Sequence, residues 1–133
     1  MRLFLDTSVI LSACNSDSGA SREIFNRAAA REWQLVVTPY VIDEVLNNLP
    51  DFPLEASAQW ANLQQQLTLR ADVVTCEWPV IFAAAKDRPI LFGALAWADV
   101  LLTLDRKDFG ELLDGSFYGL SVLKPGTFIE QTK

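Results

Sequence analysis

The feature that most constrains this chain is a continuous apolar run from Val100 to Leu104, which ends directly before Asp105. A strand that is apolar on both faces is typical of the centre of a parallel sheet whose two sides are covered by helices. In such sheets ligands bind beyond the carboxyl ends of the strands. Asp105 is therefore expected at the ligand-binding edge of the sheet.

The segment before this strand predicts a helix from Pro89 to Ala98, with an acid, Asp87, just ahead of it. Asp is a favoured helix cap, and Pro is tolerated in the first turn because the amide that it lacks would be unpaired there. Asp87 can therefore cap the helix, and Asp87 and Asp105 bracket one helix–strand unit.

The beginning of the chain repeats this arrangement. A short apolar strand from Arg2 to Leu5 is followed by Asp6, Thr7 and Ser8 and then by apolar residues, which predicts strand, turn and helix. Asp6 thus occupies the same place after its strand as Asp105. Taken alone, such an aspartate is more often a turn former or a helix cap.

A third acid reaches the same edge from a helix. Leu35 to Thr38 predicts the second strand, and Thr38 followed by Pro39 is a signal for a helix start. The helix is expected to run through Tyr40 to about Asn48. Glu44 lies in its second turn, close to the carboxyl end of that strand, whereas Asp43 points ~100° away and is expected to be exposed.

The remaining elements are less distinct. Three arginines on the second helix are expected to face outward, either as a solvated face or, in a weaker alternative, as an RNA backbone contact: Arg22, Arg27 and Arg31. The other expected elements are helices at 21–32, 54–69 and 108–113, a third strand at either 73–75 or 80–82, a final strand at 120–123, and a turn at 124–126 leading into a tail. Alternating strands and helices imply a single domain over residues 1–133, with a three-layer α/β/α fold around a mostly parallel sheet.

Composition excludes several kinds of site. The chain has 133 residues, no histidine and two cysteines, Cys14 and Cys76, which form no CxxC pair. Ordinary zinc sites and Ser-His-Asp or Cys-His catalysis are therefore excluded, and both cysteines are expected to be buried structural residues. The net charge of −6 argues against bulk electrostatic binding of nucleic acid. No apolar run reaches the ~18 residues of a membrane span, so we expect a soluble, cytoplasmic protein with no membrane partner.

Four acids are thus predicted to meet at one edge of the sheet: Asp6, Glu44, Asp87 and Asp105. Carboxylates in one pocket raise each other's pKa unless a cation is present. Oxygen-only ligands suit Mg²⁺ or Mn²⁺, which also bind phosphate oxygens. The combination therefore predicts a divalent-metal site at this edge of the sheet.

Four segments in this order, LFLDTS, TPYVIDEV, KDRPIL and LLTLDRKDF, resemble the PIN domain family of metal-dependent ribonucleases, which includes the VapC-like toxins of toxin–antitoxin pairs. The resemblance covers nearly the whole chain and is weakest between residues 51 and 85. It implies RNA hydrolysis by one or two Mg²⁺ or Mn²⁺ ions, RNA as substrate and an antitoxin protein as partner, and it allows a homodimer.

The resemblance also implies catalytic and metal-binding roles for four acids: Asp6, Glu44, Asp87 and Asp105. Three hydroxyl residues match positions that could hold metal-bound water or order the acids: Thr7, Ser8 and Thr103. Asp108 is an additional candidate ligand, and a surface position is an equal alternative for it.

Other functions fit the pattern less well. A phosphoacceptor receiver needs paired acids after its first strand, and a phosphatase with an Asp nucleophile needs DxD, whereas this chain has Asp6-Thr7-Ser8. Two alternatives stay open on the sequence alone. One is a free-standing RNA-processing nuclease, and the other is a PIN-like binding protein that does not cleave.

Overall fold

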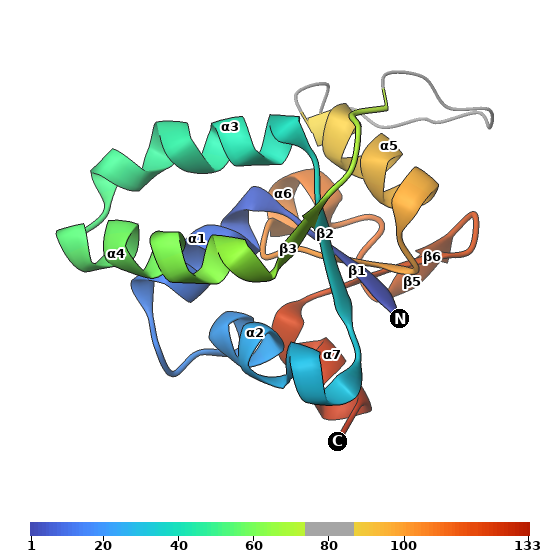
Figure 1. Ribbon diagram of the computed structural model, residues 1–133. Coiled ribbons are helices and arrows are strands. Elements are labelled where there is room, and N and C mark those ends of the chain that lie inside the picture. Colours follow the sequence, from blue (N-terminus) through green and yellow to red (C-terminus); the bar gives the residue numbers. More distant parts are fainter. Residues whose placement is uncertain (74–86) are drawn as a thin grey trace.

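The computed structural model describes residues 1–73 and 87–133, and in this part of the chain the centre is a six-stranded sheet with the order β3-β2-β1-β4-β6-β5 (Figure 1). The strands are β1 (Arg2–Leu5), β2 (Gln34–Val37), β3 (Leu67–Leu69), β4 (Val100–Leu102), β5 (Gly115–Phe117) and β6 (Leu120–Leu123). All neighbours are parallel except β5 and β6, which form an antiparallel hairpin. The predicted α/β fold with a mostly parallel sheet is confirmed.

Helices cover both faces of the sheet. They are α1 (Thr7–Asn15), α2 (Ala20–Arg31), α3 (Pro39–Asn48), α4 (Leu54–Leu63), α5 (Arg88–Trp97), α6 (Arg106–Phe109) and α7 (Pro125–Gln131). The chain steps from β1 to β2 to β3 in one direction and crosses back from β3 to β4, so right-handed crossovers place the connecting helices on opposite faces. Accordingly, α2 and α7 pack together on one side, and α5 packs against β1 and β4 on the other (Figure 1).

The core lies where β1 and β4 meet these helices. The apolar side chains of Leu3, Phe4 and Leu5 are all buried, because β1 has neighbouring strands at both edges and helices on both faces. Gly93 of α5 permits the close approach of that helix. A Cβ atom at this position would lie only 3.1 Å from the Phe4 ring and 3.3 Å from Cγ2 of Thr38.

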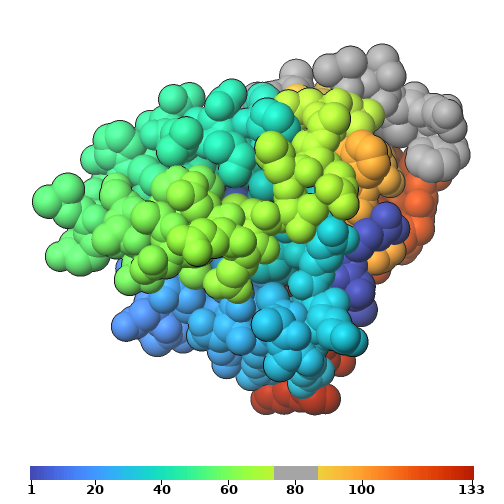
Figure 2. Space-filling view, viewed as in Figure 1, coloured from blue at the N-terminus to red at the C-terminus, as the bar shows by residue number. Residues whose placement is uncertain are grey.

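A helical pair covers α1. Helix α3 continues through a short 3-10 turn (Leu49–Asp51) and Pro53 into α4. Both helices pack against α1, and in the space-filling view they hide almost all of it (Figure 2). This cover is built around Val45, Leu49, Trp60 and Leu63, which are buried.

The prediction of one helix from 54 to 69 is wrong at its C-terminal end. Helix α4 ends at Leu63, a 3-10 turn (Gln64–Gln66) follows, and Leu67–Leu69 is the third parallel strand, paired with β2 from Leu35↔Leu67 onward. Hydrogen bonding at the open edge of the sheet outweighs the local helical pattern. Of the two predicted third strands, residues 80–82 lie outside the described residues, and Val73 of the other is described but is not in a strand.

The C-terminal region also differs from the prediction. Residues 125–131 form helix α7, whose Phe128 and Ile129 are buried, where a turn and tail were expected. The predicted helix from 108 to 113 instead begins at Arg106 and ends at Phe109, and the predicted strand from Val100 ends at Leu102. Hydrophobic periodicity predicts which face of a helix or strand is buried. It does not predict the residue at which the helix or strand ends.

The prediction that three arginines of α2 face outward is wrong for Arg22, whose Nε donates to the carbonyl of Ala13 at 2.8 Å. Arg27 lies 3.2 Å from Glu23, and Arg31 donates to the Thr132 carbonyl at 2.7 Å. These contacts favour structural roles for the three side chains. Cys14 is buried as expected, and Cys76 lies outside the described residues. None of the described helices combines the length and the apolar character needed to cross a membrane.

Candidate metal centre

The topology produces a switch point at the carboxyl ends of β1 and β4. These strands are neighbours, but the chain leaves β1 toward β2 and leaves β4 toward β6, so the connections diverge at this point. In open α/β sheets, ligands bind in the crevice at such a switch point. Asp6 directly follows β1, and its amide donates to the Leu102 carbonyl at 3.0 Å. Asp105 follows β4 and begins α6.

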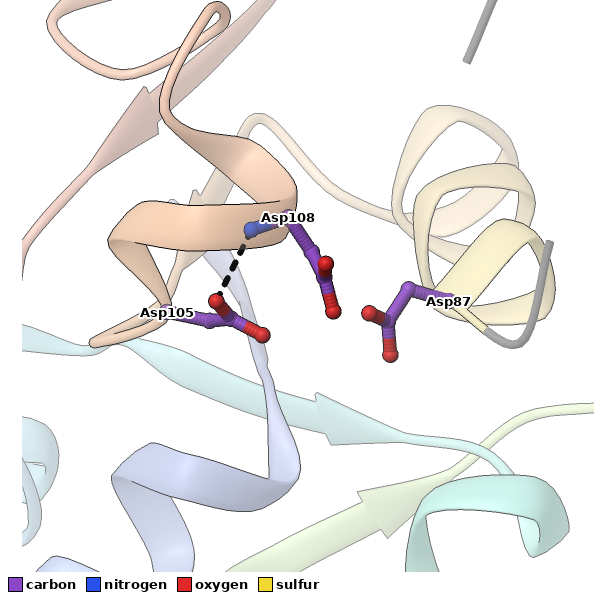
Figure 3. A group of neighbouring side chains, drawn as sticks. All are labelled: Asp87, Asp105 and Asp108. Carbon is purple, nitrogen blue, oxygen red and sulfur yellow. Dashed lines mark hydrogen bonds between the residues drawn. The ribbon is translucent and has the colours of Figure 1, made fainter. Parts of the chain in front are cut away.

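Three carboxylates face one another in this region. One oxygen from each of Asp87, Asp105 and Asp108 lies within 4.8 Å of the other two (Figure 3). Asp87 is buried just before α5, and the other two are half-buried, Asp105 just before α6 and Asp108 within it. Oδ1 of Asp105 accepts hydrogen bonds from the amides of Lys107 (3.0 Å) and Asp108 (2.9 Å). Its other oxygen is turned toward the carboxylates of Asp108 and Asp87 (Figure 3).

Asp6 lies beside this group and is held by hydroxyls. The Thr103 hydroxyl donates to Oδ2 of Asp6 at 2.7 Å and accepts from the amide of Asp105 at 3.0 Å. The Ser8 hydroxyl donates to the same oxygen at 2.9 Å and accepts from the amide of Leu104 at 3.1 Å. These two hydroxyls therefore order the acids and tie the end of β1 to the loop after β4.

Glu44 is connected to Asp6 through Thr7. The amide of Thr7 donates to Oδ1 of Asp6, and its hydroxyl donates to Oε1 of Glu44, each at 2.8 Å. Glu44 and Asp6 are not members of the group that shares oxygens within 4.8 Å. The structure thus places Asp87 and Asp105 in one cluster with Asp108. Asp6 and Glu44 lie next to this cluster and are linked to each other through hydrogen bonds from Thr7.

Burial raises the pKa of Asp6 to about 6, against the lowering effect of hydrogen bonds from Thr103, Ser8 and the Thr7 amide. The negative charge of Glu44 raises the pKa of Asp6 further. A nearby cation would reverse this effect, because it favours the ionised carboxylate. An oxygen-only set of crowded, partly buried carboxylates fits Mg²⁺ or Mn²⁺.

Asp87 takes the N-cap position that the sequence allowed, but it does not cap the helix with its side chain. Asp87 occupies the position before α5 but makes no capping hydrogen bond with its side chain, which is turned toward Asp105 and Asp108 (Figure 3). Thr38 likewise does not cap α3 with its hydroxyl. The carboxylate of Asp72 instead accepts from the amide of Tyr40 at 3.2 Å, from a segment 32 residues away.

Two residues near the acids were missed by the sequence analysis: Asp72 and Tyr40. Burial and the charges of Glu44, Asp87, Asp6 and Asp72 raise the pKa of the Tyr40 hydroxyl. Tyr40 precedes Glu44 by one helical turn, and this spacing was a usable signal. Asp72 follows a strand that the sequence analysis treated as a helix, so no signal identified it.

The sequence profile of the PIN domain matches residues 2–107. The chain belongs to the PIN domain family. PIN domains are generally nucleases that use divalent metal ions. Asp6, Glu44, Asp87 and Asp105 lie within the matched range, and Asp108 is the first residue beyond it.

The fold of this PIN domain is similar to a chain in the crystal structure of VapBC2 from Rickettsia felis bound to a DNA fragment from their promoter. The TM-score is 0.65 and the sequence identity is 15%, over 92% of this chain and 97% of that chain. At this identity the similarity concerns the fold. Among curated protein sequences there is no significant match.

Proposed function

We propose that this PIN domain is a divalent-metal-dependent ribonuclease that hydrolyses phosphodiester bonds of RNA. The observation that carries the proposal is the meeting of three carboxylate oxygens, from Asp87, Asp105 and Asp108, within 4.8 Å at the switch point of the sheet. The chain contains no histidine, so an imidazole cannot serve as general base. Carboxylates are the groups that the site offers for metal binding and proton transfer.

Asp87, Asp105 and Asp108 would hold Mg²⁺ or Mn²⁺, and Asp6 and Glu44 would complete the metal-binding pocket. A divalent cation there would lower the pKa of a bound water and would offset the charge of the scissile phosphate. The Asp105 side chain is fixed for this role, because two amides engage one of its oxygens. Asp6 is fixed by Thr103 and Ser8, so it also holds the ends of β1 and β4 together.

We further propose that the chain is the toxin of a toxin–antitoxin pair. The resemblance to VapC-like toxins and the fold similarity to a chain of the VapBC2 complex both support it. By this reading a small antitoxin protein binds the chain and blocks the acidic site. A guanidinium would be the best blocking group, because it matches carboxylates with two parallel hydrogen bonds. Co-purification with the product of a neighbouring gene tests this, and a chain that purifies alone and cleaves RNA would instead be a free-standing nuclease.

The test of the nuclease is cleavage of a mixed RNA pool in Mn²⁺, Mg²⁺ or EDTA. Wild-type protein should cleave with either metal and not in EDTA. Asp87→Asn, Asp105→Asn and Asp108→Asn should each lower the rate by orders of magnitude, because each removes one charged ligand. Asp43→Asn is the matched control, since Asp43 adjoins Glu44 on α3 but is exposed.

Two outcomes would contradict the proposal in different ways. If Asp105→Asn cleaves like wild type in Mn²⁺, the site is misassigned. If wild-type protein binds RNA but leaves it intact under all metal conditions, the chain is a non-catalytic PIN-like binding protein.

A further inference from the structure

An aromatic side chain lies at the rim of the acidic site without a part in the metal chemistry. Tyr40 is in the first turn of α3, one helical turn before Glu44, so the two side chains lie on the same face of the helix. Helices α3 and α5 are in contact (Figure 1), and Thr38, the residue before α3, lies against Gly93 of α5. The first turn of α3, which carries Tyr40, therefore lies beside the helix that follows Asp87.

The charges around the Tyr40 hydroxyl agree with this placement. The pKa of the hydroxyl is raised by burial first, and then by the negative charges of Glu44, Asp87 and Asp6 in that order. These acids come from α3, the start of α5 and the end of β1. A hydroxyl influenced by all of them lies on the side of α3 that faces these acids.

The ring is only half-buried. One part of it packs against the hydrophobic core, and the rest stays accessible to solvent beside the acids. The helix turn that carries it is fixed, because its amide donates to the carboxylate of Asp72. The site therefore presents an anchored aromatic surface next to the place where a phosphate would be held.

We infer that Tyr40 is a specificity-determining residue, whose ring stacks on one nucleobase of single-stranded RNA next to the scissile phosphate. The inference rests on the proposed function and specifies how it selects its substrate. Unpaired bases can be splayed out and stacked on aromatic side chains, whereas bases in a duplex cannot.

The inference is tested by RNA binding, measured in Mn²⁺ with an Asp105→Asn background that prevents cleavage. Tyr40→Leu removes the ring and should weaken the binding of a short single-stranded RNA roughly 5- to 160-fold, the range found for one stacked base. Tyr40→Phe keeps the ring and should bind like the parent protein. Tyr118→Leu is the matched control, because Tyr118 is the other tyrosine of the chain and lies in the exposed β5–β6 turn.

An abasic scan of the RNA identifies the stacked nucleotide. In the protein that keeps Tyr40, removing the base at one position should weaken RNA binding by a similar factor. In Tyr40→Leu, removing the same base should not weaken binding any further. If Tyr40→Leu unfolds at the assay temperature, Tyr40→Met replaces it, since Met is unbranched and has a similar reach. A single position at which base removal weakens binding only when Tyr40 is present supports stacking. Equal losses in Tyr40→Phe and Tyr40→Leu would assign the effect to the hydroxyl and overturn the inference, as would the absence of coupling at every position.

The test separates this inference from the proposed function. Wild-type protein that cleaves RNA without any coupling between Tyr40 and a base refutes stacking alone. Wild-type protein that cleaves no RNA refutes the nuclease, and the binding measurements in the Asp105→Asn background still decide whether Tyr40 stacks on a base.

Discussion

At the scale of single residues, two fully buried threonines differ in the hydrogen bonds of their hydroxyl groups. Thr103 and Thr38 are both fully buried. The hydroxyl of Thr103 joins Asp6 to the amide of Asp105, whereas the hydroxyl of Thr38 has no hydrogen-bond partner among the described residues. Since an unsatisfied buried polar atom carries a desolvation cost, the two hydroxyls should contribute to stability with different signs.

Thr103→Val is expected to lower the free energy of unfolding by about 1–3 kcal/mol, because it leaves a buried carboxylate oxygen of Asp6 with one donor fewer. Thr38→Val should be neutral or slightly stabilising, since it replaces an unpaired hydroxyl by a methyl group of similar size. Urea denaturation of both variants measures the difference. Equal destabilisation by the two substitutions would contradict the assigned role of Thr103.

The pKa of Asp6 predicts how stability depends on pH in EDTA. The carboxyl loses its proton near 3.8 in the unfolded chain and at about 6 in the folded one, so the folded state binds more protons between these values. Stability from this group is complete below the unfolded pKa and is lost as pH rises through about 6, a change on the order of 2–3 kcal/mol.

Denaturation from pH 4.5 to 7.5 should therefore show a decline for wild type that is much smaller in Asp6→Asn. Asp99→Asn is the control that should keep the decline, because contacts with Arg2 lower the pKa of Asp99. A profile of Asp6→Asn that parallels wild type would place the titrating group elsewhere.

At the scale of elements, the start of α3 depends on a residue outside the helix. Asp72 supplies the side-chain cap that Thr38 does not, and α3 carries both Glu44 and Tyr40. A further contact holds the same segment, since Nε1 of Trp97 at the end of α5 donates to the Ala71 carbonyl at 2.9 Å. The chain after β3 thus fixes the helix that brings Glu44 to the site.

Asp72→Ala should destabilise the fold by about 0.5–2 kcal/mol, the usual cost of losing a helix cap. It should also weaken RNA cleavage, because Glu44 and Tyr40 lose a fixed helix start. Asp72→Asn retains an acceptor oxygen and should restore most of the stability. Thermal melts together with the RNA assay check this, and unchanged melting of Asp72→Ala would show that the cap contributes little.

At the scale of the whole molecule, metal binding and folding are linked. Without metal, Asp105→Asn should melt higher than wild type, because it relieves repulsion among the acids and keeps an oxygen for the Lys107 and Asp108 amides. With Mn²⁺ at 100 times its dissociation constant, wild type should gain about 2.7 kcal/mol and the order should reverse. Thermal melts in EDTA and in Mn²⁺ measure both, with Asp43→Asn as control. Equal metal-induced shifts in wild type and Asp105→Asn would argue against a metal site there.

The sequence alone was sufficient to predict a strand or helix wherever its local hydrophobic pattern agrees with the face that is buried in the fold. The strands β1, β2, β4 and β6 and the helices α1, α2, α3 and α5 were expected within a few residues, because apolar runs and amphipathic segments directly reflect the face that must be buried. Acids after strands one and four also followed from the sequence, since the parallel α/β topology brings the carboxyl ends of these strands together.

Tertiary structure decided what local pattern does not encode. Leu67–Leu69 is a strand because the edge of β2 offers hydrogen bonds, and residues 125–131 are helical because Phe128 and Ile129 find the core. Asp87 faces Asp105 and Asp108 instead of capping its helix, and Asp72 caps α3 from a distant segment. Each of these depends on contacts between residues far apart in the chain, so the sequence determined which acids were available and the fold determined which of them meet.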